Sequence, residues 1–198
     1  AVEEYEELLK RYEFLSNQEK DLTQAKEKLQ EVIRRIDETV LTMFTQTFKQ
    51  VGEYFKEFYR RLFNGGHARI YLIDEQDPLE SGIEIEAHPP GKKPQSIHQL
   101  SGGEQALTAI ALLFAIFKTK PSPFCILDEV DAPLDDTNIS RFLEIVKEFA
   151  QNSQFIIITH NKQTMASADA IIGITQQERG VSEIISVQLK EFLESTTV

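Results

Sequence analysis

The sequence contains a single cysteine, Cys125, and no tryptophan. One cysteine cannot form a disulfide within the chain, so the sequence fits a reducing compartment such as the cytoplasm. Cys125 lies in an apolar run, which predicts burial as a small hydrophobic residue rather than reactivity. No basic segment followed by an apolar one opens the chain, so the sequence shows no secretory signal.

An excess of positive charge is also missing. The chain holds 21 Lys and Arg against 32 Asp and Glu, a net charge of −11. Residues 1–62 are nearly balanced, so most of the negative charge lies after them. Nucleic-acid binding normally requires a basic surface that displaces counterions from phosphates. We therefore expect DNA contacts to be made mainly by other parts of a complex.

Long hydrophobic runs are absent as well. The longest apolar stretch, Ala106 to Phe117, is too short to span a bilayer and contains Thr108, so no membrane association is expected. A buried helix is the better interpretation of this stretch. With 41% hydrophobic and 27% charged residues, the 198-residue chain has the composition of a globular domain that carries an appendage.

Residues 1–62 contain no proline and one glycine, Gly52. Apolar residues recur there in steps of four and three, the heptad seam of a coiled coil. The seam runs through Leu8, Tyr12, Leu15, Glu19, Leu22, Lys26, Leu29, Ile33, Ile36, Val40 and Met43. No partner helix is evident in the chain, and a helix packed on its own domain remains the alternative. Because the opening is already helical, we expect the chain to be a segment of a longer polypeptide.

From Phe44 to Phe63 aromatic residues become dense, which predicts that the helix leaves the coil and enters a core before Asn64-Gly65-Gly66 ends it. We place the boundary between a coiled-coil arm or neck helix, residues 1–50, and a globular lobe, residues 51–198. Within the lobe we expect a helix from the Ser-Gly-Gly segment to about Lys118 and another over 139–149. Strands are expected at 68–73, 82–87, 124–127, 155–158, 170–174 and 182–189. Continuous apolar strands separated by helices indicate an α/β fold with a parallel sheet covered by helices on both faces.

Four apolar residues, Phe124 to Leu127, precede two carboxylates, Asp128 and Glu129. A buried strand that ends in acids places them in the crevice where α/β sheets bind ligands. Two adjacent acids there resist burial unless a cation or a polarised water occupies the site. Mg²⁺ bound by Asp128 would satisfy the first, and Glu129 would then deprotonate a water. A merely solvated strand end is the alternative.

The segment Leu100-Ser101-Gly102-Gly103-Glu104-Gln105 lies immediately before the apolar helix. Ser101 can cap that helix, and two glycines allow a phosphate to approach the free backbone N–H groups at its positive end. A simple Ser-Gly-Gly linker is the alternative, and the adjoining helix argues against it.

Two further segments follow the acids. Asp131-Ala-Pro-Leu-Asp-Asp136 is a tight loop that, at the least, is a turn capping the next helix through Asp136 or Thr137. Thr159-His160-Asn161 ends the next apolar strand, which we expect beside the acidic one. His160 is then within reach of the same phosphate, although a lone histidine is more often structural.

These four segments occur in one order over 61 residues. They resemble the signature motif, Walker B strand, D-loop and switch histidine in the C-terminal half of an ABC-type ATPase. The run from Leu100 to Asp136 resembles the bacterial type of the SMC family (structural maintenance of chromosomes), and the likeness extends over nearly the whole chain. Pro133 departs from the family, which more often has a small residue there.

The resemblance makes the missing P-loop informative. No Gly-x-x-x-x-Gly-Lys-Ser/Thr motif occurs in the sequence, and Gly91-Lys92-Lys93 lacks the upstream glycine and the hydroxyl. In SMC proteins the P-loop lies at the N-terminus, beyond the coiled-coil arm and hinge. The resemblance therefore implies that this chain supplies half of a composite ATP site, and that residues 51–198 are the C-terminal lobe of the head.

Residue roles are implied by the same resemblance. Asp128 would help to hold Mg²⁺, Glu129 would activate the hydrolytic water, and His160 would sense the γ-phosphate. The motif residues Leu100, Ser101, Gly102, Gly103, Glu104 and Gln105 would contact ATP on a second head, and Asp135 would couple the two sites. A kleisin subunit would bridge the heads. The implied output is chromosome condensation and segregation at the nucleoid.

Three alternatives stay open. The chain resembles a double-strand-break-repair ABC ATPase in its motifs and coiled coil. A transporter ATPase fits less well, because of the N-terminal coiled coil. A catalytically silent scaffold is disfavoured by Glu129 and His160.

Overall fold

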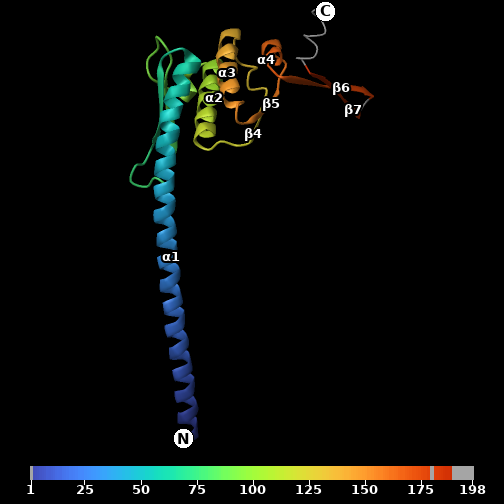
Figure 1. Cartoon of the computed structure of the whole chain (residues 1–198). Helices are drawn as coiled ribbons and strands as arrows, with labels where there is room; N and C mark the ends of the chain where they lie inside the picture. Colours follow the sequence, from blue (N-terminus) through green and yellow to red (C-terminus); the bar gives the residue numbers. More distant parts are fainter. Residues whose placement is uncertain (1, 179–180, 189–198) are drawn as a thin grey trace, which may run out of the picture. The chain divides into compact units, whose positions relative to one another are not determined.

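The computed structural model describes residues 2–178 and 181–188 (Figure 1). The elements are α1 (Val2–Phe63), β1 (His67–Leu72), β2 (Ile83–His88), β3 (Gln95–Ser96), the 3-10 helix η1 (Ile97–Gln99), α2 (Gly102–Thr119), β4 (Phe124–Asp128), α3 (Asp136–Phe149), β5 (Gln154–Ile158), α4 (Lys162–Ala166), β6 (Ala170–Glu178) and β7 (Val181–Gln188). The expected Leu189 and the last residues of the 51–198 lobe lie outside the described residues.

The backbone forms two compact units. One contains the chain up to Phe48 together with Asp74–Ser81, and the other contains Lys49–Ile73 and the residues from Gly82 onward. The helix α1 contributes to both. Among the described residues, no helix combines the length and the apolar character needed to cross a membrane.

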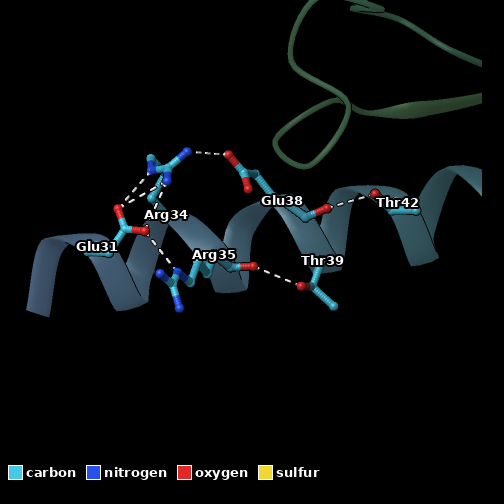
Figure 2. A network of polar contacts seen from close by, with 6 residues as sticks. All are labelled: Glu31, Arg34, Arg35, Glu38, Thr39 and Thr42. Carbon is cyan, nitrogen blue, oxygen red and sulfur yellow. Dashed lines mark hydrogen bonds and ion pairs between the residues drawn. The ribbon is translucent and has the colours of Figure 1, made fainter. Parts of the chain in front are cut away.

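In the first unit, α1 keeps its apolar seam exposed. Seam residues from Leu8 to Met43 are in solvent, including Leu22 and Leu29. The polar face is stabilised by short-range ion pairs, in which Glu31 accepts from Arg34 and Arg35, and Arg34 also reaches Glu38 (Figure 2). Such pairs at exposed helix positions contribute only about 0.3–0.5 kcal/mol each. The seam therefore has no partner among the described residues, as the sequence predicts.

In the second unit, the last turns of α1 enter a core. Phe55, Phe58, Tyr59 and Leu62 are fully buried, which confirms the predicted change along the aromatic stripe. The rings of Phe58 and Phe114 of α2 lie 5.9 Å apart, and Phe114 lies 5.8 Å from Phe142 of α3. The α1 helix ends at Phe63, before Asn64 and Gly65, which have positive φ.

The described residues also form two antiparallel sheets, β1–β2–β3 and β6–β7. β1 pairs with β2 from His67↔His88 to Leu72↔Ile83, and the short β3 pairs with the other edge of β2. β6 and β7 pair from Ala170↔Gln188, with an irregularity between Thr175 and Glu178. The strands β1, β2, β6 and β7 lie where the sequence predicts strands. The strand β3 was not predicted, because its two residues are too few to give a period-2 signal.

The remaining sheet is parallel. β4 pairs with β5 in the register Phe124↔Gln154 to Asp128↔Ile158. On one face, Leu127 is buried and Phe155 packs on Phe117 of α2, with ring centroids 5.5 Å apart. On the other face, side chains of both strands are exposed: Phe124, Ile126, Ile156 and Ile158. The α/β class and the helix cover are thus confirmed, but the described residues cover one face rather than the two expected.

Candidate functional site

The acids Asp128 and Glu129 lie where β4 ends. The Glu129 N–H donates to the Ile158 carbonyl at 2.9 Å, which continues the pairing of β4 with β5 beyond Asp128. Glu129 itself adopts a left-handed backbone with φ of 48°. A non-glycine residue in this region costs free energy and occurs preferentially at functional sites. This residue lies at the edge of the sheet where parallel strands present ligand-binding groups.

His160 follows β5 and meets Glu129. Its Nε2 lies 2.8 Å from Glu129 Oε1, and both side chains are open to solvent, at 87% and 52% exposure. The second oxygen, Glu129 Oε2, makes no hydrogen bond to the part of the chain that the structure describes. Parallel pairing of β4 and β5 brings the two residues together from 31 positions apart in the sequence. The arrangement leaves one carboxylate oxygen available to accept a proton while the other is held by the imidazole.

Asp128 is exposed and has no ion pair within residues 2–178 and 181–188. No group of three or more His, Cys, Asp or Glu side chains in these residues is arranged to hold a metal ion. A lone carboxylate fits Mg²⁺, which keeps several waters and takes its remaining ligands from substrate phosphates. It does not fit a cation enclosed by this chain alone.

The loop after Glu129 is shaped by two backbone turns. Ala132 N–H donates to the Glu129 carbonyl at 3.2 Å, and Leu134 N–H donates to the Asp131 carbonyl at 3.1 Å. Asp135 caps α3, because its Oδ1 accepts from the Asn138 N–H at 2.8 Å. The predicted N-cap, Asp136 or Thr137, is therefore wrong by one or two residues. Two acids and a threonine in a row, Asp135 to Thr137, all suit this role, so composition cannot choose among them.

The segment Leu100 to Gln105 forms the start of α2. Leu100 is buried, whereas Ser101 and Gly102 are exposed. The Glu104 carboxylate accepts from both the N–H and the hydroxyl of Ser101, at 3.0 and 2.8 Å, which is a helix start rather than a linker. Gln105 Nε2 donates to the Ile97 carbonyl at 3.1 Å.

Lys92, in the loop before this segment, also holds Glu104. Its Nζ lies 2.8 Å from Glu104 Oε1. The hydrogen bond from Lys92 lowers the pKa of the Glu104 carboxyl below its ordinary value, and the Ser101 donors lower it further against an opposing effect of burial. The carboxylate thus stays ionised beside the positive end of α2.

Gly103 is the point where the helix start meets the acidic loop. A Cβ on Gly103 would lie 3.2 Å from the Pro133 carbonyl oxygen, whereas a Cβ on Gly102 would meet nothing within 4 Å. The structure therefore brings together two groups: Glu129 with His160, and Gly103 with the loop before Asp135. Within the described residues, no hydrogen bond joins Ser101 to His160, so the chain presents the two groups separately.

Sequence reasoning missed three residues of this region. They are Asp131, Thr164 and Lys92. Asp131 is buried and accepts hydrogen bonds from the hydroxyls of Thr159 and Thr164. Lys92 forms an ion pair with Glu104. Asp131 is one of three acids in a loop whose composition predicts exposure, so nothing in the sequence marks it as buried. Thr164 belongs to α4, a five-residue helix that is too short for a periodic signal.

The chain is similar to known proteins over nearly its whole length. Residues 1–183 match the family model of the RecF/RecN/SMC N terminal domain. The chain is 52% identical over 190 residues to the "Chromosome partition protein Smc" of Desulfitobacterium hafniense (strain Y51), which covers 96% of this chain and 16% of that protein. It therefore spans less than a fifth of the length of the curated relative it matches.

Two solved structures are similar along the chain. The Smc head domain with an extended coiled coil bound to the C-terminal domain of ScpA, derived from Pyrococcus furiosus, has a TM-score of 0.77 at 41% identity and covers 98% of this chain and 48% of that chain. A second structure comes from work on the "structural biochemistry of ATP-driven dimerization and DNA stimulated activation of SMC ATPases". Its TM-score is 0.68 at 44% identity, and the match covers 78% of this chain and 93% of that chain. The protein belongs to the RecF/RecN/SMC N terminal domain family, and its fold is that of an SMC head with its coiled coil.

Proposed function

We propose that this chain is the C-terminal half of a composite ATP-hydrolysing head that dimerises on ATP. The observation that carries the proposal is the contact between Glu129 and His160 at the ends of two adjacent parallel strands, with Glu129 Oε1 2.8 Å from His160 Nε2. Membership of a family that includes SMC ATPases supports it. A silent scaffold would have no need of this solvent-open pair.

In the proposed mechanism, Glu129 is the general base. Its free Oε2 accepts a proton from the attacking water, while Oε1 remains bonded to His160, which orients the carboxylate and senses the γ-phosphate. Asp128 would hold Mg²⁺, and the cation would supply positive charge to the phosphate oxygens.

The start of α2 acts on a second head. Leu100, Ser101, Gly102, Gly103, Glu104 and Gln105 form a positively polarised helix start, exposed at Ser101 and Gly102, that would contact the γ-phosphate bound by the partner head. Asp135, the N-cap of α3, lies in the loop that touches Gly103 and would couple the two ATP sites. The dimerization on ATP described for the related SMC ATPases supports this role.

The missing P-loop would come from the N-terminal half of the same head. Two surfaces of this chain fit that partner. The first is the exposed β4–β5 face, which presents the apolar side chains of Phe124, Ile126, Ile156 and Ile158 to solvent. The most exposed of these four is Ile126, at 59%. The α1 seam is apolar and open. We assign residues 1–50 to the coiled-coil arm and neck, and residues 51–198 to the C-terminal lobe.

At the level of the whole protein, we propose chromosome condensation and segregation in the cytoplasm, at the nucleoid. The similarity to chromosome partition protein Smc favours this over break repair. A kleisin subunit is the expected further partner, because the related head from Pyrococcus furiosus is bound to ScpA. DNA contacts would come mainly from other parts of the complex, given the net charge of −11.

Reconstitution tests the proposal. This chain alone should hydrolyse no ATP and bind it poorly, since the P-loop supplies most phosphate contacts. Adding the N-terminal half should restore phosphate release, and the Glu129→Gln chain, added in the same way, should not. Micromolar ATP binding by this chain alone in calorimetry, or equal hydrolysis with Glu129→Gln, would overturn the proposal.

A further inference from the structure

Asp131 carries a buried carboxylate that the proposed mechanism does not use. It is 1% exposed, in a loop whose other acids are in solvent. Its Oδ2 accepts from the Thr159 hydroxyl at 2.7 Å and from the Thr164 hydroxyl. Burying a carboxylate is costly unless donors compensate it, so these two hydroxyls matter more than surface hydrogen bonds do.

The two donors lie on either side of His160. Thr159 directly precedes it, and Thr159 Oγ1 also accepts from the Asn161 N–H at 2.8 Å. Asn161 in turn caps α4, with its Oδ1 accepting from Gln163 and Thr164 N–H groups. The backbone on both sides of His160 is therefore fixed through hydrogen bonds that lead back to Asp131.

His160 needs such support. Its side chain is 87% exposed, so packing does little to hold the ring. Its contact partner, Glu129, lies two residues before Asp131, and the Glu129 carbonyl accepts from Ala132 N–H just after it. Asp131 thus belongs to the segment that carries the base, and it is hydrogen-bonded to the segment that carries the histidine.

We propose that Asp131 is a positioning residue, which sets the contact between His160 and Glu129 by clamping Thr159 and Thr164. The inference rests on the proposed function, because it assigns Asp131 an effect on hydrolysis. It differs from a purely structural role: a stabilising network would change the melting temperature, whereas a positioning network also changes kcat through His160.

Thr164 offers the sharpest test. It is buried in α4, and its hydroxyl donates only to Asp131. Thr164→Val keeps the side-chain shape and removes the donor, whereas Thr164→Ser keeps the donor. Ser153→Ala is the matched control, because Ser153 is buried at the other end of β5 and its hydroxyl donates to the Ser122 carbonyl at 2.7 Å.

The variants are measured in the complete head, that is, this chain together with its N-terminal half. We expect Thr164→Val to lower kcat about 10-fold, with KM for ATP and ATP-dependent dimerisation retained. Thr164→Ser should stay within about 3-fold of the unmodified head, and Ser153→Ala should leave kcat unchanged. In a His160→Ala head, Thr164→Val should cause no further loss, because its effect runs through His160. Should Thr164→Val fail to fold, Thr159→Val removes the other donor and carries the same expectations.

Three results would overturn the inference: a kcat for Thr164→Val equal to that of Ser153→Ala, a loss shared by Thr164→Ser, or additive losses in the His160→Ala head. Failure of the proposed function looks different. In that case Glu129→Gln and His160→Ala would themselves leave ATP hydrolysis intact, whereas failure of the inference alone would leave the losses caused by these two variants in place.

Discussion

Gly103, at the start of α2, faces the carbonyl oxygen of Pro133 so closely that a Cβ on the glycine would lie 3.2 Å from that oxygen. The segment proposed to reach a partner's nucleotide thus touches the loop that leads from Glu129 to Asp135. The neighbouring Gly102 has open space around it. The two glycines therefore differ in what a methyl group would disturb.

Replacing each glycine with alanine should separate these effects. Gly103→Ala should destabilise the complete head by about 1 kcal/mol, because the loop must move to admit the methyl group. Gly102→Ala should leave the melting temperature unchanged or slightly raised. It should still weaken ATP-dependent dimerisation, because the methyl group faces the partner. Thermal melting and size-exclusion chromatography measure the two effects, and equal melting temperatures for both variants would contradict the contact with Pro133.

Glu129→Gln should preserve ATP binding and dimerisation of the complete head while hydrolysis falls by about 100-fold or more. Glutamine has the same shape and can still hydrogen-bond water, but it cannot take a proton. Size-exclusion chromatography with ATP should therefore show a stable dimer, and a phosphate-release assay should show the lost turnover.

Ser101→Arg should block dimerisation instead. The head still loads ATP on its own P-loop, but a bulky side chain at the exposed start of α2 prevents docking on the partner's nucleotide. Added to Glu129→Gln, it should convert the ATP-bound dimer to a monomer in the same chromatography. A double variant that still dimerises would show that Leu100–Gln105 has a structural role only.

The ion pair of Lys92 with Glu104 predicts a pH dependence. The pKa of Glu104 is lowered in the folded protein, so the pair contributes stability above the ordinary carboxyl pKa and loses it as the pH falls through the lowered value. Lys92→Gln should lower the melting temperature by about 1–2 °C at pH 7, since the pair is partly exposed and contributes about 0.5 kcal/mol. The difference should shrink at pH 4. Lys93→Gln is the matched control, and an equal shift with it would rule out the pair.

An isolated peptide of residues 1–43 should be only marginally helical. Its seam is exposed along α1, and helices that lack a packing partner are weakly stable in water. Circular dichroism should show helicity that rises when the matching arm segment of the N-terminal half is added. A stable monomeric helix at micromolar concentration would contradict pairing of this seam.

Much of the fold could be predicted because the spacing of apolar residues along the sequence indicates which segments are helices or strands and which faces are buried. The stripe through Phe55, Phe58 and Tyr59 marks the buried end of α1, and the apolar run before Asp128 marks β4. In contrast, the sequence could not predict that only one face of the β4–β5 sheet is covered by the described residues. A strand whose second face is covered by another polypeptide has the same continuous apolar sequence as one covered by its own chain.

The positions of the candidate residues at the strand ends could be predicted, whereas their contacts could not. The motif order places Glu129 and His160 at neighbouring strand ends, where the structure has them. The burial of Asp131 depends on hydroxyls donated by Thr159 and Thr164, which come from a loop and a short helix about 30 residues further along. Such long-range polar pairing leaves no periodic pattern in one sequence.

The left-handed backbone of Glu129, with φ of 48°, restricts which mutations this position tolerates. Glycine and asparagine adopt that conformation readily, whereas valine, isoleucine and threonine resist it by about 1–3 kcal/mol. Amino-acid replacements at residue 129 therefore fall into two classes, one that removes the carboxylate alone and one that also distorts the end of β4. An SMC head that lost the carboxylate of residue 129 during evolution would therefore keep the end of β4 intact if glycine or asparagine replaced it. Valine, isoleucine or threonine at this position would distort the end of the strand.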